Sequence, residues 1–255
     1  MIKAFIFDLD GTLVQTEPMK NLAYVQAARE LSMDDLNETE LLQSCTELIG
    51  VPAPETAMEL VQRFGLEKAA RARLAEFGAD SPWQVFSQLQ LRYYNRLLDD
   101  TAAVRAAQLS HNISLLHEVR RKGYPTALAT MSYRHETQRV LEALALAHAF
   151  AAIVTQDDVQ RGKPDPEIYL RVAQALGIAP TACLVIEDSL SGVQAALAAG
   201  MWCVAVPTPL TSQAIHDAHV LDERWIVDDP TAVKAVVWSV VEKAKREQGR
   251  VRSDE

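Results

Sequence analysis

One predicted β-strand stands apart from the rest of its sheet, and this separation constrains the fold more than any other feature of the sequence. Residues 2–7 are almost continuously apolar, which is typical of a strand buried on both faces of a parallel sheet. The segment that follows, up to about residue 107, carries apolar residues at helical spacing. The next apolar runs that fit strands begin only at residue 125, so the helical segment interrupts a sheet.

Predicted helices and strands alternate from about residue 114 onward. Strands are expected at residues 125–130, 151–155, 183–188, 202–207 and 224–229, with a helix between each successive pair of the first four and a last helix over about residues 231–246. This alternation predicts an α/β fold, a three-layer Rossmann-like core with a parallel sheet. We therefore assign residues 1–14 and 108–255 to the core, and residues 15–107 to an inserted, all-helical cap domain.

The composition limits the classes of partner. Apolar residues make up 49% of the 255 residues, and 25 Lys and Arg against 34 Asp and Glu give a net charge of −9. No basic tract favours nucleic-acid binding, and no run approaches the ~20 apolar residues of a membrane span. Three cysteines without metal-like spacing indicate reduced core thiols. We expect a cytoplasmic protein that binds neither nucleic acid nor membrane.

Polar side chains follow the predicted strands at the points where the strands end. Because ligands bind beyond the carboxyl ends of the strands in an open parallel sheet, we expect these side chains to meet at one edge. The set contains four acids, a lysine and two hydroxyls: Asp8, Asp10, Thr130, Ser132, Lys163, Glu187 and Asp188.

Such a cluster indicates a divalent cation and a phosphate. Neighbouring carboxylates raise each other's pKa unless a cation is present, and oxygen ligands without His or Cys favour Mg²⁺. Lys163, Thr130 and the backbone N–H groups of the turn around Leu9 can hold phosphate oxygens. Asp8 could then act as a nucleophile towards phosphorus, and Asp10 could exchange a proton with the leaving group and with water.

Four motifs resemble those of the haloacid dehalogenase superfamily of phosphohydrolases. DLDGT at residues 8–12 is similar to the first motif, ALATMS at 127–132 to the second, GKPDPEIY at 162–169 to the third, and LVIEDSLSGVQAALAAGM at 184–201 to the fourth. The helical segment resembles the cap that one branch of the superfamily inserts just after the first motif. That branch includes small-metabolite phosphatases and β-phosphoglucomutase.

The resemblance implies catalytic and phosphate-binding roles. Asp8 would be the nucleophile that becomes an aspartyl-phosphate, and Asp10 would be the general acid and base. Thr130 would bind the transferring phosphoryl group, with Ser132 as a weaker candidate. Lys163 would bridge that group and Asp8.

The resemblance also implies a magnesium site and an activity. Asp8, the backbone carbonyl of Asp10, Glu187 and Asp188 would hold Mg²⁺, with one of the last two acting through water. The expected function is a Mg²⁺-dependent phosphohydrolase acting on a small phosphorylated metabolite such as a sugar phosphate. We expect a monomer or a weak dimer, with a helical lid that opens for the substrate.

Four alternative functions compete with this interpretation. Phosphonoacetaldehyde hydrolases lack an acid at the position of Asp10, and dehalogenation would need neither Asp10 nor magnesium. A β-phosphoglucomutase needs a cationic clamp in its cap, but Thr46–Ala57 contains no Arg or Lys, and Lys20 stands where the mutase has a histidine. A non-catalytic binding protein is disfavoured because the buried charges would cost stability without a ligand. We therefore favour a phosphatase.

The chain departs from the family pattern at two places. Many relatives have an acid where this chain has Gln15, and Ser110 and His111 replace a usual Pro-Gly before the helix preceding the second motif. Neither departure falls on a residue expected to carry the chemistry. We expect His111 to have no catalytic role, and Arg71 and Arg73 to lie on a solvated helix face.

Overall fold

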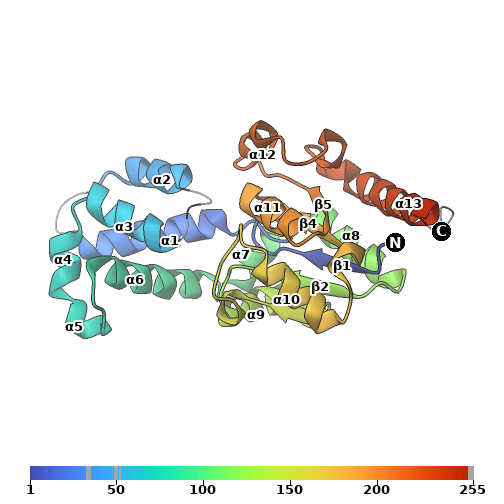
Figure 1. Ribbon diagram of the computed structural model, residues 1–255. Coiled ribbons are helices and arrows are strands. Elements are labelled where there is room, and N and C mark those ends of the chain that lie inside the picture. Colours follow the sequence, from blue (N-terminus) through green and yellow to red (C-terminus); the bar gives the residue numbers. More distant parts are fainter. Residues whose placement is uncertain (33–35, 49–50, 52, 252–255) are drawn as a thin grey trace. The chain divides into compact units, whose positions relative to one another are not determined.

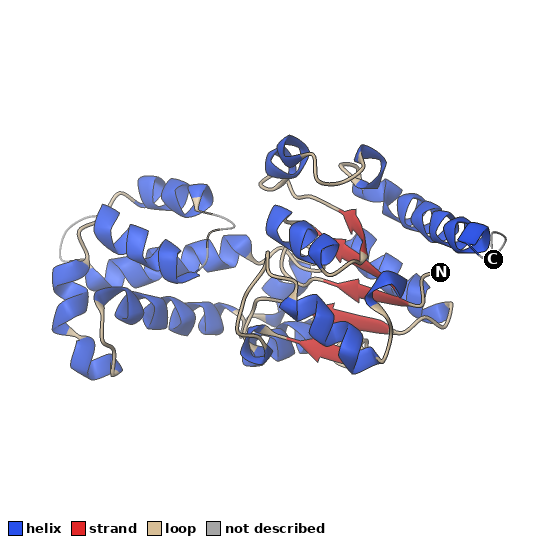
Figure 2. Cartoon of the chain, in the orientation of Figure 1, coloured by secondary structure: helices blue, strands red, loops and turns tan. Residues whose placement is uncertain are grey.

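The central sheet is parallel throughout. The structure is a computed structural model that describes residues 1–32, 36–48, 51 and 53–251. Within these residues, five strands form one sheet in the order β3-β2-β1-β4-β5 (Figure 1 and Figure 2). The strands are β1 (Ala4–Phe7), β2 (Thr126–Ala129), β3 (Ala152–Val154), β4 (Cys183–Glu187) and β5 (Trp202–Ala205).

The isolated strand of the sequence is the centre of this sheet. In β1, Ile6 pairs with Ala127 of β2 on one side and with Val185 of β4 on the other. All four residues of β1 are completely buried, as its continuous apolar sequence predicts for a strand covered on both faces. Because all strands run in the same direction, their carboxyl ends lie along a single edge of the sheet.

Helices cover both faces of the sheet and complete a three-layer α/β core, which confirms the predicted fold class (Figure 2). Two of them, α10 and α11, pack on one face, and α8 and α13 pack on the other, where Trp238 of α13 meets Phe5 edge-on. The helices of this part of the chain are α7 (Thr101–Ala106), α8 (Ser110–Arg121), α9 (Arg134–Ala143), α10 (Glu167–Leu176), α11 (Leu190–Ala198), α12 (Ser212–Ala218) and α13 (Val233–Val251).

The chain divides into two compact units. Unit 1 comprises Met1–Gln15 and Ala102–Glu255, and unit 2 comprises Thr16–Thr101. The described part of unit 2 is helical and contains α1 (Glu17–Leu31), α2 (Glu38–Glu47), α3 (Ala53–Arg63), α4 (Glu67–Ala72), α5 (Leu74–Phe77) and α6 (Pro82–Leu97). In its core, α6 packs against α1 and α3 around buried residues such as Leu60 and Phe86. That residues 15–107 act as a cap stays a prediction.

The expectation of a solvated face at Arg73 is wrong. Arg73 lies between α4 and α5, and its guanidinium donates to Glu30 Oε1 at 2.8 Å and to Glu76 Oε1 at 2.7 Å. Arg92 and Tyr93 donate to the other oxygen of Glu30. Although burial opposes the effect, these donors lower the pKa of Glu30 to about 2. Because the guanidinium binds two carboxylates within unit 2, only Arg71 has the predicted exposure.

The predicted strand at residues 224–229 is also wrong. The segment forms a short 3₁₀ helix, η3 (Glu223–Trp225), and only Ile226 makes a single parallel bridge, to Ala205. Asp222 favours this turn because its carboxylate accepts a hydrogen bond from the backbone N–H of Arg224. The final helix begins at Val233 and continues to Val251, beyond the predicted end at residue 246.

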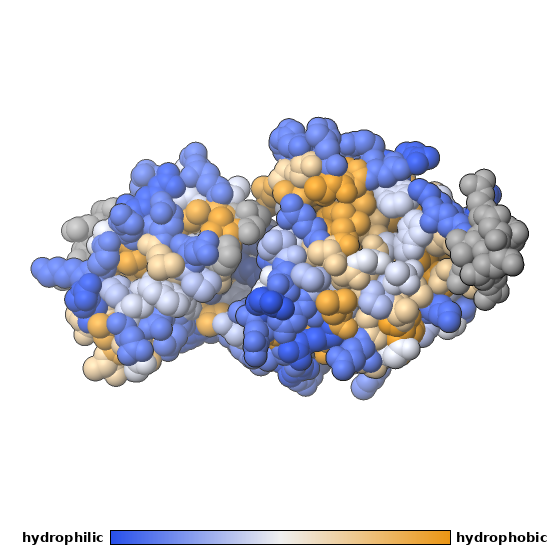
Figure 3. Space-filling view, in the orientation of Figure 1, coloured by the Kyte–Doolittle hydropathy of each residue, from blue (hydrophilic) through white to orange (hydrophobic). Residues whose placement is uncertain are grey.

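The surface and the cysteines agree with the composition. Figure 3 shows a surface on which hydrophilic residues predominate and hydrophobic residues form separate areas. The cysteines Cys45, Cys183 and Cys203 are buried and form no disulfide, as predicted. Among the helices that the structure describes, none is long and apolar enough to span a membrane.

Candidate active site

Three neighbouring strands deliver the predicted site residues to the carboxyl edge of the sheet. Asp8 directly follows β1, Thr130 directly follows β2, and Glu187 is the last residue of β4. The backbone continues the ladder past β1, because the N–H of Asp8 donates to the carbonyl of Ile186 at 3.1 Å. The structure therefore brings these side chains together where parallel-sheet topology predicts.

Lys163 joins two of the acids. It lies in the loop between β3 and α10, and its Nζ donates to Asp8 Oδ1 at 2.7 Å and to Glu187 Oε1 at 2.6 Å. A third hydrogen bond runs to the carbonyl of Ala129 at 3.2 Å. Three acceptors match the three N–H donors of an ammonium group, and the side chain is only 6% exposed. The charge of Lys163 is therefore held at a fixed point of the edge.

The ionisation of these groups is strongly coupled. Burial disfavours the charge of Lys163, but the adjacent Asp8 and Glu187 outweigh burial and raise the pKa of the ammonium. Burial also raises the pKa of Asp8, which Lys163 only partly offsets. For Glu187, Lys163 and further donors outweigh burial and hold the pKa of the carboxyl below its ordinary value. The single positive charge of Lys163 is therefore smaller than the total negative charge that the acids of this edge can carry.

The carboxylate of Glu187 is fixed on both of its oxygens. In addition to Lys163, Tyr169 of α10 donates its hydroxyl to Oε1 at 2.8 Å. The other oxygen accepts from the backbone of Asp188 at 2.9 Å, and from the backbone and hydroxyl of Ser189, each at 3.0 Å. A Cβ atom at Gly192 would lie 1.8 Å from Oε1, so only glycine leaves room for this carboxylate at the start of α11.

Asp10 has a different environment from Asp8. Its Oδ2 accepts from the hydroxyl of Ser132 at 2.5 Å and from that of Thr130 at 3.4 Å. The turn that contains Asp10 is closed by the carbonyl of Leu9, which accepts from the backbone of Leu13 at 2.8 Å. In this structure the two hydroxyls predicted to bind phosphate thus face the carboxylate of Asp10.

Asp188 completes an acidic cluster. Carboxylate oxygens of Asp8, Glu187 and Asp188 all lie within 4.8 Å of one another. The hydroxyl of Thr12 is 3.5 Å from Asp188 Oδ1, and a Cβ atom at Gly11 would lie 2.1 Å from Asp188 Oδ2. Gly11 also has φ of +78°, which a side chain would strain. Buried carboxylates in excess over lysine are a suitable donor set for a hard metal ion.

Comparison with known proteins settles the family. The haloacid dehalogenase-like hydrolase family matches residues 2–200, which is most of the chain and includes every residue of the site. The chain belongs to this family. The resemblance inferred from the four motifs is therefore confirmed.

Two similar proteins are named as phosphatases. Validoxylamine A 7'-phosphate phosphatase of Streptomyces hygroscopicus subsp. limoneus is 28% identical over 230 residues, covering 88% of this chain and 97% of that protein. Hexitol phosphatase A of Escherichia coli K12 is 30% identical over 232 residues, covering 89% and 95%. These relatives confirm the prediction that the hydrolase is a phosphatase.

A solved structure supports the fold of the hydrolase. β-Phosphoglucomutase from Clostridium difficile superposes with a TM-score of 0.70 and 24% identity, covering 97% of this chain and 99% of that one. This similarity concerns the architecture and does not distinguish a mutase from a phosphatase.

Sequence reasoning missed residues that support the site of the hydrolase. Tyr169, Ser189 and Gly192 all contact or make room for Glu187, yet none was predicted to do so. All three lie within the third and fourth motifs. Tyr169 follows Lys163 by six residues and lies in the first turn of α10, and the centre of its ring is 5.2 Å from Lys163 Nζ. Motif membership was thus the available signal, but the partner of each side chain is visible only in three dimensions.

Proposed function

We propose that this phosphatase is a Mg²⁺-dependent enzyme that transfers the phosphoryl group of a small phosphorylated metabolite to Asp8 and then to water. The observation that supports the proposal best is the pairing of Asp8 with the fixed ammonium of Lys163, next to Asp10 in its separate, hydroxyl-bonded environment. One carboxylate lies against a cation, which suits a nucleophile, and the other is placed to exchange a proton.

The first step forms a bond between a carboxylate oxygen of Asp8 and phosphorus, while the bond from phosphorus to the ester oxygen breaks. Asp10 gives its proton to that oxygen as the alcohol leaves. In the second step Asp10 takes a proton from water, whose oxygen attacks the phosphorus and releases Asp8. Lys163 places its charge next to the phosphoryl oxygens in both steps, and we assign Thr130, Ser132 and the backbone of Leu9 to holding these oxygens.

The metal ligands follow from the contacts of the acidic cluster. Both oxygens of Glu187 already accept hydrogen bonds, so we assign direct coordination to Asp8, Asp188 and the carbonyl of Asp10, and a supporting role to Glu187. When bound, Mg²⁺ would supply positive charge that offsets the surplus of carboxylates and the charge of the phosphate.

For the substrate we propose a phosphate monoester of a sugar or sugar alcohol. The names of the two relatives support this class, since one acts on a hexitol phosphate and the other on validoxylamine A 7'-phosphate. Isomerisation remains the second candidate because of the β-phosphoglucomutase fold. The segment Thr46–Ala57 provides no cationic clamp for a second phosphate, although its residues 49, 50 and 52 lie outside the described part.

The experiment measures turnover of p-nitrophenyl phosphate and a set of sugar phosphates by the wild type and by Lys163→Ala. Turnover should require Mg²⁺, and the variant should lose on the order of 10²–10³-fold in kcat, because it lacks a preorganised charge at the transition state. Asp217→Asn on the surface serves as a control that also changes one charge. Near-normal kcat in Lys163→Ala would refute the assigned role.

Product analysis separates the two candidate functions. With β-glucose 1-phosphate we expect either no reaction or release of inorganic phosphate. Clean formation of glucose 6-phosphate in the presence of a bisphosphate activator would instead establish a mutase.

A further inference from the structure

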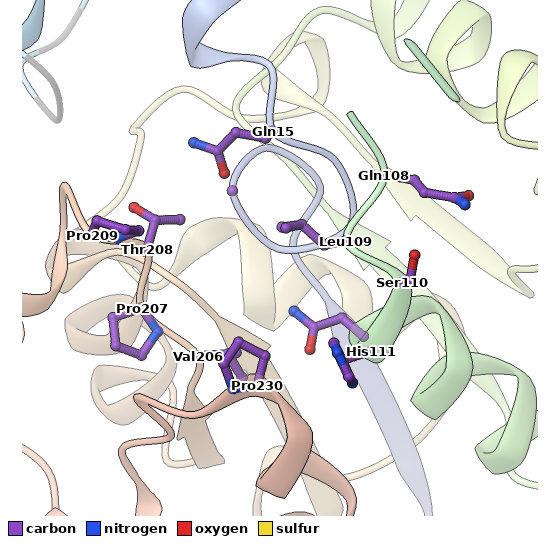
Figure 4. Close-up of a pocket in the computed structure, with 12 residues that line it drawn as sticks. Gln15, Gln108, Leu109, Ser110, His111, Val206, Pro207, Thr208, Pro209 and Pro230 are labelled. Atoms are coloured by element: carbon purple, nitrogen blue, oxygen red, sulfur yellow. The ribbon is translucent and has the colours of Figure 1, made fainter. Parts of the chain in front are cut away.

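Unit 1 contains a cavity that the proposed reaction does not use. Its volume is about 370 Å³, within the range of small-molecule sites. Figure 4 shows the segment Val206–Pro209, which follows β5, on one side and the segment Gln108–His111, which leads into α8, on the other. Gln15 lies between them. Among the residues that the structure describes, none of those assigned to catalysis, phosphate binding or metal binding lines this cavity.

The lining has a distinct chemical character. One part is apolar, with Leu109, Val206 and prolines 207, 209 and 230. The other part offers amide, hydroxyl and imidazole groups, from Gln15, Gln108, Ser110, His111, Asn112 and Thr208. No Asp, Glu, Lys or Arg is found among the described residues that line the cavity. A phosphorylated or otherwise charged ligand would have no counter-charge there, so the cavity fits an uncharged molecule with both hydroxyl groups and an apolar face.

The two departures from the family pattern coincide in this cavity. Gln15, Ser110 and His111 are the positions at which the sequence departs from the pattern expected from the resemblance. Although nearly a hundred residues separate the two departures along the chain, both line the same cavity. Their side chains are an amide, a hydroxyl and an imidazole, which add hydrogen-bonding groups to the wall without a carboxylate, an ammonium or a guanidinium.

Asn112 connects the cavity to the acidic cluster. It lines the cavity but is only 3% exposed, and its Nδ2 donates to the carbonyl of Thr12 at 2.7 Å. Within the described part of the chain, its Oδ1 has no hydrogen-bond partner. The hydroxyl of Thr12 in turn lies 3.5 Å from Asp188, and Gly11, another lining residue, packs against the same carboxylate. A change at Asn112 can thus reach Asp188 through one intervening residue.

We propose that this cavity binds a small uncharged polyol, a sugar or sugar alcohol without phosphate, and that its occupancy lowers turnover through Asn112 and Thr12. The regulatory half rests on the proposed function, because an alcohol of this class is what the proposed reaction releases. The binding half stands independently of any turnover.

Binding is tested by NMR with the full chain, titrated with D-glucitol and D-glucose. The side-chain amide signals of Gln15, Gln108 and Asn112 report on the cavity directly. We expect these signals to shift with a Kd of about 1–10 mM, a free energy typical of a weak metabolite site. Gluconate and glucosamine, which carry opposite charges at similar size, should bind at least about tenfold more weakly, a difference of about 1.4 kcal/mol.

Variants locate the site. The double variant Ser110→Pro, His111→Gly restores the family pattern and should weaken binding at least tenfold, as should Gln15→Glu. His117→Ala, an exposed position on the same helix, is the matched control and should bind like the wild type. Two results would overturn the proposal. One is the absence of any shift at the three amides, and the other is equal binding by the wild type and the double variant.

A kinetic measurement tests the regulatory half. Saturating D-glucitol should lower the kcat for p-nitrophenyl phosphate without raising its KM, and the double variant should not respond. A rise in KM alone would place the polyol at the strand-end edge and refute regulation through this cavity. If the wild type turns over no phosphate ester at all, the proposed function fails, while the NMR result still decides on binding.

Discussion

Asp8 and Asp10 lie two residues apart but are surrounded by different chemistry. Asp8 is buried against the ammonium of Lys163, whereas Asp10 is only half-buried and accepts hydrogen bonds from the hydroxyls of Ser132 and Thr130. Hydroxyl groups can reorient to donate or to accept, so they tolerate both protonation states of Asp10. An ammonium group can only donate, and it favours the ionised state of the carboxylate that it contacts.

We expect Asp10→Asn to separate these roles. The variant keeps the shape of the turn and the backbone carbonyl but cannot exchange a proton. It should slow the cleavage of sugar alcohol esters far more than that of p-nitrophenyl phosphate, whose leaving group needs no proton, and it should prolong the life of the phosphoenzyme. Single-turnover kinetics with acid quench measure both effects. Equal slowing on both esters with an unchanged phosphoenzyme lifetime would show that Asp10 has only a structural role.

Tyr169 is the second residue whose role can be isolated. Its ring lies 5.2 Å from Lys163 Nζ, and its hydroxyl donates to Glu187. Tyr169→Phe keeps the ring and removes the donor. Because a hydrogen bond to a buried charge is worth about 1.5–3 kcal/mol, we expect a loss of unfolding free energy of about that size. Turnover should also fall, while the KM for p-nitrophenyl phosphate stays near its wild-type value.

The control for Tyr169→Phe is Tyr124→Phe, whose ring is half-buried and packs against Phe5 and Trp238. This control should change neither kcat nor KM. If Tyr169→Phe loses stability but keeps the wild-type kcat, then Tyr169 stabilises the fold without positioning Lys163 and Glu187.

At the scale of elements, all five strands of the sheet were predictable, including the edge strands β3 and β5, and only the segment beyond β5 was not. The strands β1, β2 and β4 are short apolar runs, and their sequences allow little besides burial in the middle of a sheet. The segment around Trp225 also carries consecutive apolar residues, but the carboxylate of Asp222 accepts a hydrogen bond from the backbone of Arg224 and favours a turn. Local polar contacts of this kind override periodicity at an edge.

The same distinction applies to the site. The positions of Asp8, Thr130 and Glu187 follow from strand ends, so parallel topology was enough to predict that they meet. Which acceptor the hydroxyls of Thr130 and Ser132 contact, and how Glu187 is held, depend on differences of a few tenths of an ångström in the distances between atoms. Such details require the packing of α10 and α11 and cannot be inferred from residue spacing.

His216 of α12 contacts carboxylates in and next to residues 224–229, where a strand was wrongly predicted. The direction of its pKa shift can be predicted. His216 lies within 3.1 Å of Asp228 Oδ1 and 3.0 Å of Glu223 Oε2, and these carboxylates, Asp228 first, raise the pKa of the imidazole. NMR titration should give a pKa for His216 above the ordinary value of about 6.5, and Asp228→Asn should lower it towards that value. A wild-type pKa at or below the ordinary value would contradict this.

The sign of the effect on stability follows. Because the pKa of His216 is higher in the folded state than in the unfolded state, its contribution is fully present below the unfolded pKa. The contribution is lost as the pH rises through the folded pKa. The imidazole is at the surface, so solvent screens the effect and Asp228→Asn should remove the pH dependence without unfolding the protein.

For the whole molecule, the excess of acids predicts that a divalent cation stabilises the fold. The net charge is −9, and the cluster of Asp8, Glu187 and Asp188 concentrates part of it in a buried place. Mg²⁺ that binds only the folded state should raise the unfolding free energy, by about 2.7 kcal/mol at one hundred times its Kd. Thermal unfolding with and without EDTA measures this gain.

Asp188→Asn should abolish the stabilisation by Mg²⁺, whereas Asp217→Asn, which changes the net charge equally at an exposed position, should preserve it. An equal response of both variants would mean that the ion acts through the overall charge and not through the cluster.

The point where the chain leaves unit 1 and returns to it has a consequence for how such proteins diversify. Val14 and Gln108 form an antiparallel bridge, and hydrogen bonds of 2.9 Å from Gln15 to Ala107 and from Leu109 to Leu13 close it. The backbone of unit 1 thus holds the two ends of the intervening segment next to each other. A graft between these two residues needs only ends that lie close together, whatever its length or sequence. Unit 1 can therefore be inherited unchanged while the inserted segment is replaced by another.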